Sequence, residues 1–185
     1  MGMQTVILIY QLGMYQMLKY FMKCFIVQKK FNQDIGAWDV GKATSFKRMI
    51  YGASAFNADI MNWNVGRITS FEGMFFTAFA FKSELKDWNV ANSRSFAYMF
   101  SYSSVFESDL SNWNVNKGTD FHHMFTGITQ FNSDLQNWDV SRSTSFYGTF
   151  EGASSFNADL GKWNVGEVTE FSNMFLGATQ FNSDL

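Results

Sequence analysis

Apolar residues recur along this chain with a period of 25 residues, without insertion or deletion. Counted from its first Phe, the unit follows the pattern F-N-x-D-[IL]-x-x-W-[DN]-V-x-x-x-T-x-F-x-x-M-F-x-G-A-x-x, and we number its positions 1 to 25. Residues 181–185 begin a seventh unit after six full ones, which are 31–55, 56–80, 81–105, 106–130, 131–155 and 156–180.

Two short elements are predicted in each unit. Positions 5, 8 and 10 are apolar around a polar position 9, which is typical of a short strand. Positions 16, 19 and 20 have the i, i+3, i+4 spacing of one helical face and predict a short helix or 3-10 turn. Thr at position 14, such as Thr69 before Glu72, would cap that helix at its N-terminus. Glycine at position 22 would supply the left-handed residue at its C-terminus, in Gly52, Gly127, Gly152 and Gly177.

A unit of this kind cannot bury its own apolar face, whereas stacked copies can. We therefore predict an α/β repeat solenoid over residues 31–185, with six units and a five-residue stub. In this fold the Phe and Trp columns stack on one another, and Phe46, Met49 and Ile50 point inward together.

The columns explain the composition of the 185-residue chain, which has 22 Phe, 6 Trp and no Pro. With 19% aromatic and 16% charged residues, the chain does not have the composition of a disordered protein. The formal net charge is -2, so the chain lacks the surplus of Lys and Arg that binding to a phosphate backbone requires. We therefore expect no nucleic-acid partner. Cys24 is the single cysteine, cannot form an internal disulfide, and fits a buried position.

The repeat resembles a known family. Phe56-Asn57-Ala58-Asp59-Ile60, then Trp63-Asn64-Val65 and Met74-Phe75, are similar to the 25-residue repeat of the BspA-like leucine-rich-repeat surface proteins, also found in mycoplasma lipoproteins. This resemblance implies a right-handed leucine-rich-repeat-type stack, a role in adhesion or protein recognition, and a location at the cell surface or outside the cell. Phe replaces the family's Met at position 16, as in Phe46, which argues against close transfer of function.

The two ends follow the pattern less closely. Residues 1–30 are interpreted as a degenerate half-unit or cap, because Phe21, Cys24 and Phe25 precede Phe46, Met49 and Ile50 by 25 residues. A membrane anchor is the alternative, since residues 1–18 carry no charge, although they have no clear signal-peptide pattern. The uncapped C-terminal unit favours end-to-end self-association.

Few residues suggest chemistry. His122 and His123 are adjacent, have no accompanying nucleophile and are interpreted as solvated surface residues, so we predict neither an enzyme nor a cofactor. We expect the Asp and Asn of position 9 to form a ladder of side-chain amides. The acids of position 4 are expected to form Asx turns, with calcium binding by pairs such as Asp134 and Asp139 as the alternative. This acidic column comprises Asp34, Asp59, Glu84, Asp109, Asp134, Asp159 and Asp184.

Positions that differ between units are the candidates for binding a partner. Positions 17 and 18 vary from Lys47-Arg48 to His122-His123. Position 12 is mainly basic, and we expect its column to bind a protein or glycan. The predicted function is therefore a non-enzymatic scaffold for recognition or adhesion, and the alternative is a structural spacer or self-associating array. The predicted binding column consists of Lys42, Arg67, Asn92, Lys117 and Arg142.

Overall fold

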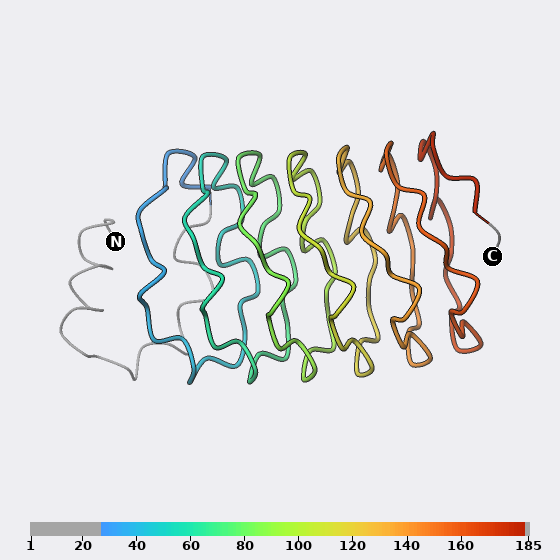
Figure 1. The fold of residues 1–185 in the computed structure, drawn as a ribbon, viewed down its shortest axis with the longest axis horizontal. Helices are drawn as coiled ribbons and strands as arrows, with labels where there is room; N and C mark the ends of the chain where they lie inside the picture. Colours follow the sequence, from blue (N-terminus) through green and yellow to red (C-terminus); the bar gives the residue numbers. More distant parts are fainter. Residues whose placement is uncertain (1–26, 184–185) are drawn as a thin grey trace.

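The computed structural model describes residues 27–183. These residues run through successive coils that lie side by side in chain order along the longest axis (Figure 1). Each coil corresponds to one 25-residue unit, because equivalent residues of neighbouring units touch. The rings of Phe81 and Phe106, for example, stack with centroids 5.8 Å apart.

The predicted α/β solenoid, a right-handed leucine-rich-repeat-like stack of strand–helix units, is wrong. Residues 27–183 contain neither a helix nor an extended strand, and their backbone consists of turns, bends and irregular segments. Positions 8 to 10 form no strand. Strand-like pairing among the described residues is limited to isolated parallel bridges at position 15, which are Ser70–Ser95, Ser95–Asp120, Asp120–Ser145 and Ser145–Glu170.

Tight turns replace the helix predicted around positions 16 to 20. Met49 N donates to Phe46 O at 3.0 Å, a bond that spans three residues, whereas an α-helix bonds each N–H to the carbonyl four residues back. The neighbouring N–H groups donate to carbonyl oxygens of the next coil, as Ile50 N does to Met74 O at 3.0 Å. Alternate backbone N–H groups therefore bond within a coil and between coils.

Left-handed residues at positions 18 and 22 stop helix formation. The prediction of left-handed glycines is confirmed, with φ of 74° at Gly52 and 67° at Gly127, but these residues end no helix. Non-glycine residues at the same two positions also adopt φ of 53° to 61°, and each costs about 1 kcal/mol or more. They are Arg48, Thr77, Tyr98, Tyr102, His123 and Asn173.

The apolar columns form the core, as predicted. Rings of position 20 stack between coils, with Phe100 and Phe125 centroids 5.9 Å apart, and also face position 1, with Phe100 and Phe106 centroids 4.0 Å apart. Burying each ring contributes on the order of 1.5 to 3 kcal/mol. The three residues predicted to point inward together are at most 3% exposed, namely Phe46, Met49 and Ile50.

The Thr column links coils and caps no helix, contrary to the prediction. Thr144 N and Thr144 Oγ1 both donate to Thr119 O, at 2.8 and 3.0 Å. Thr69 makes the same two bonds to Thr44 O, at 2.8 and 3.0 Å. This side chain therefore reinforces the backbone bond between two coils.

Asparagine side chains of position 2 join the coils. Asn32 Oδ1 accepts a hydrogen bond from Asn57 N at 2.8 Å, in the next coil. We expected a ladder of this kind at position 9, but there the side-chain oxygen turns back on its own loop. Asn64 Oδ1 accepts from Gly66 N, two residues ahead, at 3.4 Å.

The interpretation of residues 1–30 as a half-unit, cap or anchor, and the prediction for Cys24, fall mainly on residues 1–26, which lie outside the described part. Lys29 O accepts from Ala55 N at 3.0 Å, so the first described residues contact the coil that follows. At the other end Phe181 stacks on Phe156 at 6.0 Å. Within residues 27–183 no helix has the length and apolar character to cross a membrane.

Candidate functional site

The position 12 column lies on the surface, and all five of its predicted residues are exposed. Lys117 Nζ donates to Asn92 Oδ1 at 2.7 Å, and Asn92 Nδ2 donates to Gly66 O at 2.8 Å. The middle of the column is therefore tied together across three coils. Its basic members are Lys42, Arg67, Lys117 and Arg142.

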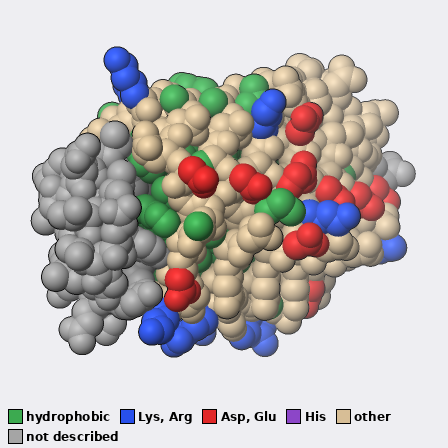
Figure 2. Space-filling view, turned by 60° about the vertical axis from the view of Figure 1, so that its left-hand side comes forward, with side chains coloured by type: hydrophobic (Ala, Val, Ile, Leu, Met, Phe, Trp, Pro, Cys, Tyr) green, Lys and Arg blue, Asp and Glu red, His purple; other side chains and the backbone are tan. Residues whose placement is uncertain are grey.

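The described aspartates of the acidic column form Asx turns, as predicted, whereas Glu84 accepts a hydrogen bond from the Ser108 hydroxyl and Asp184 lies outside the described residues. Asp134 Oδ1 accepts from Gln136 N at 2.9 Å, and the N–H of Ser111 holds the pKa of Asp109 below its ordinary value. Figure 2 shows acidic side chains in a row on one face of the molecule. Among residues 27–183 no group of three or more His, Cys, Asp and Glu side chains is arranged to hold a metal ion.

The two histidines are half-buried, which corrects the interpretation of them as solvated residues. His122 Nδ1 hydrogen-bonds Asp120 Oδ1, which raises the pKa of this histidine against the effect of its burial. His123 Nδ1 lies 2.9 Å from Thr126 Oγ1, and burial lowers the pKa of His123. Because the Thr126 hydroxyl is 2.7 Å from the Gly148 carbonyl and donates to it, this pair offers no exposed nucleophile.

His123, at one of the variable positions 17 and 18, belongs to a continuous row of surface rings that the repeat pattern alone does not reveal. The centroids of contacting rings in this row lie 4.5 to 6.2 Å apart. At one end the Arg48 guanidinium lies 5.9 Å from the centroid of Tyr51, a cation–π contact. We call this row the aromatic strip, and it consists of Tyr51, Phe76, Tyr98, Tyr102, His123 and Tyr147.

Glycines of the following coil let the rings of the strip lie close to the backbone. A Cβ atom added to Gly127 would come within 2.5 Å of the Tyr102 ring, and one added to Gly148 within 2.5 Å of His123. The outer parts of the strip remain accessible, since Tyr102 is 47% exposed and Tyr147 is 37% exposed. The rings of Tyr102 and His123 therefore lie directly against backbone that carries no side chain.

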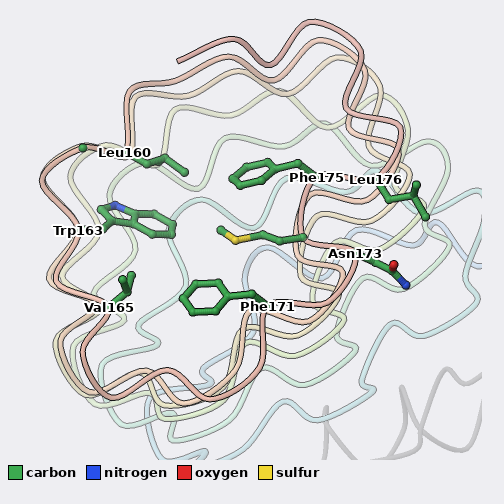
Figure 3. A pocket seen from close by; sticks show the side chains of 9 residues that line it. Leu160, Trp163, Val165, Phe171, Asn173, Phe175 and Leu176 are labelled. Atoms are coloured by element: carbon green, nitrogen blue, oxygen red, sulfur yellow. The ribbon is translucent and has the colours of Figure 1, made fainter. Parts of the chain in front are cut away.

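The last coil has an open apolar face. It contains a cavity of about 690 Å³ lined by Trp163, Phe171, Phe175 and their neighbours (Figure 3). Phe171 is 43% exposed and Leu176 is 58% exposed, whereas Phe146, one coil earlier, is fully buried.

Residues 15–113 and 98–185 both match one family model, described as Mycoplasma protein of unknown function, DUF285. The chain belongs to this family. No curated protein and no solved structure matches it. DUF285 membership agrees with the mycoplasma part of the resemblance and with a repeat protein, because two overlapping stretches fit the same model.

This DUF285 chain also has a smaller polar hollow of about 290 Å³ beside Trp138. Asp139 and Lys162 line it, but the Asp139 carboxylate already accepts from the Ser141 hydroxyl at 2.7 Å, and this bond lowers the pKa of Asp139. The carboxylate of this hollow is thus engaged in local structure. The position 12 column and the aromatic strip are the more extended candidate surfaces of this chain.

Proposed function

We propose that this DUF285 chain is a non-enzymatic scaffold for protein or glycan recognition, displayed at a cell surface as the resemblance to BspA-like surface proteins implies. One observation carries the proposal: the constant apolar positions are buried, while the variable position 12 beside them is exposed. Trp88 and Val90 are 3% and 1% exposed, while Asn92, two residues further, is exposed. Rows of such variable residues on stacked units form extended binding surfaces in repeat proteins.

The histidine pair contributes to the packing of the coils. His122 Nδ1 hydrogen-bonds Asp120, and His123 Nδ1 lies 2.9 Å from Thr126 Oγ1, whose hydroxyl donates to Gly148 O in the next coil. The hydroxyl beside this pair is therefore engaged in packing, which favours a recognition role over nucleophilic catalysis.

We expect substitution of the four basic residues of the position 12 column by Ser to weaken binding about tenfold or more, because exposed charges steer and orient a partner. The substitutions are Lys42→Ser, Arg67→Ser, Lys117→Ser and Arg142→Ser, made together. Binding would be measured on a panel of matrix proteins and glycans, at low and at physiological salt.

A matched control removes the same charge elsewhere on the exposed surface. It carries Lys29→Ser, Lys82→Ser, Lys86→Ser and Lys162→Ser, all at exposed residues outside the column. If both variants bind like the parent chain, the column is not the binding face. An equal loss of affinity in both variants would mean that binding depends on the net charge of the chain and not on the position 12 column.

A second candidate function is a structural array in which chains associate end to end. The open face of the last coil favours it, because Val165, Phe171 and Leu176 are 37%, 43% and 58% exposed around one apolar cavity. Exposed apolar surface of this kind commonly marks an interaction site.

Light scattering over a concentration series tests this array. We expect the parent chain to show a rising mass, and Leu176→Glu to remain monomeric, because a buried unpaired carboxylate opposes association. A parent chain that stays monomeric at the highest soluble concentration would rule out the array through this face.

A further inference from the structure

The aromatic strip combines features of an interface centre on a molecule whose other aromatic columns are buried. Tyr, Phe and Arg are enriched in the cores of protein interfaces, and Tyr is among the residues that carry most binding energy. The strip offers Tyr102 and Tyr147 as accessible rings, with Phe76 and Tyr98 packed between them and Arg48 at the end.

Three strip residues place bulky rings at the left-handed positions 18 and 22. Tyr98 and His123 occupy position 18 with φ of 55° and 53°, where other units have Gly73 and Gly148. Tyr102 occupies position 22 with φ of 61°, where four units have Gly. The scaffold needs no side chain at these points, and a bulky residue there costs stability. Thr77 and Asn173 share this backbone conformation, so the feature peculiar to the strip is the choice of large rings at these positions.

Acidic residues outnumber basic ones around the strip. At positions 15, 17, 18, 21 and 22 the described units carry Glu72, Asp120, Glu151 and Glu170 against Lys47 and Arg48. Both bases pair with the same acid, Glu72, at 2.6 and 3.3 Å. The rest of the strip therefore has an excess of negative charge, balanced only in part by the two histidines.

Tyr98 lies close to one of these carboxylates. Burial raises the pKa of Tyr98, and the nearby Asp120 raises it further, while Arg48 opposes this effect. The Asp120 carboxylate thus adds negative charge beside the centre of the strip. Such a surface repels anionic glycans and phosphate groups and attracts cations.

We propose that the aromatic strip binds a Lys- and Arg-rich peptide segment of a protein partner. The proposal rests on the recognition function above and names its ligand class. Ammonium and guanidinium groups bind the faces of Tyr rings by cation–π contact, and their aliphatic stems cover exposed ring surface. Asp120 and Glu151, beside Tyr98 and His123, supply the countercharge.

Binding should weaken as the pH falls. Asp120 and Glu72 face His122, and Glu151 faces His123, with Tyr98 and Tyr147 packed against these rings. Protonation of the two histidines adds positive charge beside the carboxylates, and this charge competes with a cationic ligand. The peptide should therefore bind more tightly at about pH 8.5 than at about pH 5.5.

The test uses the full chain and a blocked peptide of about nine residues that alternates Lys and Ser, followed by fluorescence anisotropy. Counterparts with Gln or Glu in place of Lys are the comparison ligands. We expect the Lys peptide alone to bind, and Tyr102→Gly with Tyr147→Ser to weaken it about tenfold. Glu151→Gln should also weaken it, and His122→Gln with His123→Gln should flatten the pH dependence.

Phe79→Ser is the matched control, because Phe79 is 49% exposed and lies outside the strip. Its binding should equal that of the parent chain. Tyr102→Gly relieves a left-handed residue, so its unfolding midpoint reports whether that variant is folded. Equal binding of the Lys and Gln peptides, or binding insensitive to the strip variants, would overturn the proposal. Binding of the matrix and glycan panel without the Lys peptide would reject this inference alone, and no binding of either would reject both proposals.

Discussion

Replacing Phe96 by Ala should lower the free energy of unfolding by about 3 to 5 kcal/mol. Phe96 is completely buried, and its ring contacts Phe71, Trp113 and Phe121, with centroids 6.0, 6.1 and 5.2 Å away. Truncation leaves a cavity between three coils, and the neighbouring rings are held by their own columns. Urea unfolding followed by tryptophan fluorescence and by circular dichroism would measure the loss.

Phe171→Ala is the control at the same position of the last coil. Phe171 is 43% exposed, so much of its surface is already in water and the expected loss is about 1.5 kcal/mol or less. If both substitutions cost the same, position 16 does not gain its stability from stacking between coils. A change in the slope of the unfolding curve would indicate a change in the surface exposed on unfolding.

The sequence predicted the core because side-chain spacing alone determines it. A period of 25 residues without insertion places equivalent residues next to each other in any stacked arrangement, whatever the backbone does between them. The burial of Phe46, Met49 and Ile50 followed from this pattern, as did the stacking of the Phe and Trp rings.

The backbone could not be predicted in the same way. The i, i+3, i+4 spacing of Phe46, Met49 and Ile50 fits a helix, but tight turns bury the same three side chains. Glycine at position 22 fits both a helix end and an isolated left-handed residue. Position 18 decides between them, and Arg48 and Tyr98 are left-handed there although their residue types disfavour it.

Alternating hydrogen bonds explain why the period is so strict. Every second N–H between positions 16 and 22 donates to the next coil, as Phe96 N does to Asp120 O at 2.9 Å and Tyr98 N to His122 O at 2.9 Å. One added residue would exchange the groups that bond between coils with those that bond within them. The ladder therefore selects units of equal length.

The two candidate surfaces differ in how far the sequence alone predicts them. The position 12 column appeared in the sequence because its mainly basic residues, from Lys42 to Arg142, stand at one position of the unit. The aromatic strip did not, because Phe76, Tyr98 and Tyr147 stand at three different positions of the unit and only the stacking of coils brings them together. Large residues at position 22, where glycine prevails, are the signal that could have revealed Tyr102.

Replacing Trp113 by Phe should cost about 2 to 3 kcal/mol of unfolding free energy, since it removes both a hydrogen bond and part of a buried ring. Trp113 is 3% exposed, and its Nε1 donates to Leu85 O at 2.9 Å in the preceding coil. Trp88 N donates to the same carbonyl at 3.0 Å, so this oxygen keeps one of its two partners. Urea unfolding followed by circular dichroism would measure the change.

Trp163→Phe separates the hydrogen bond from its surroundings. Trp163 Nε1 donates to Leu135 O at 2.9 Å in the same way, but this indole is only half-buried on the open last coil. Water can replace the lost donor there, so we expect a loss of about 1 kcal/mol. Equal losses at the two sites would mean that the indole N–H matters independently of burial. A larger loss of unfolding free energy at Trp113 would show that the hydrogen bond contributes more where a further coil covers it. The covering coil excludes the water that could otherwise replace the indole N–H as the donor.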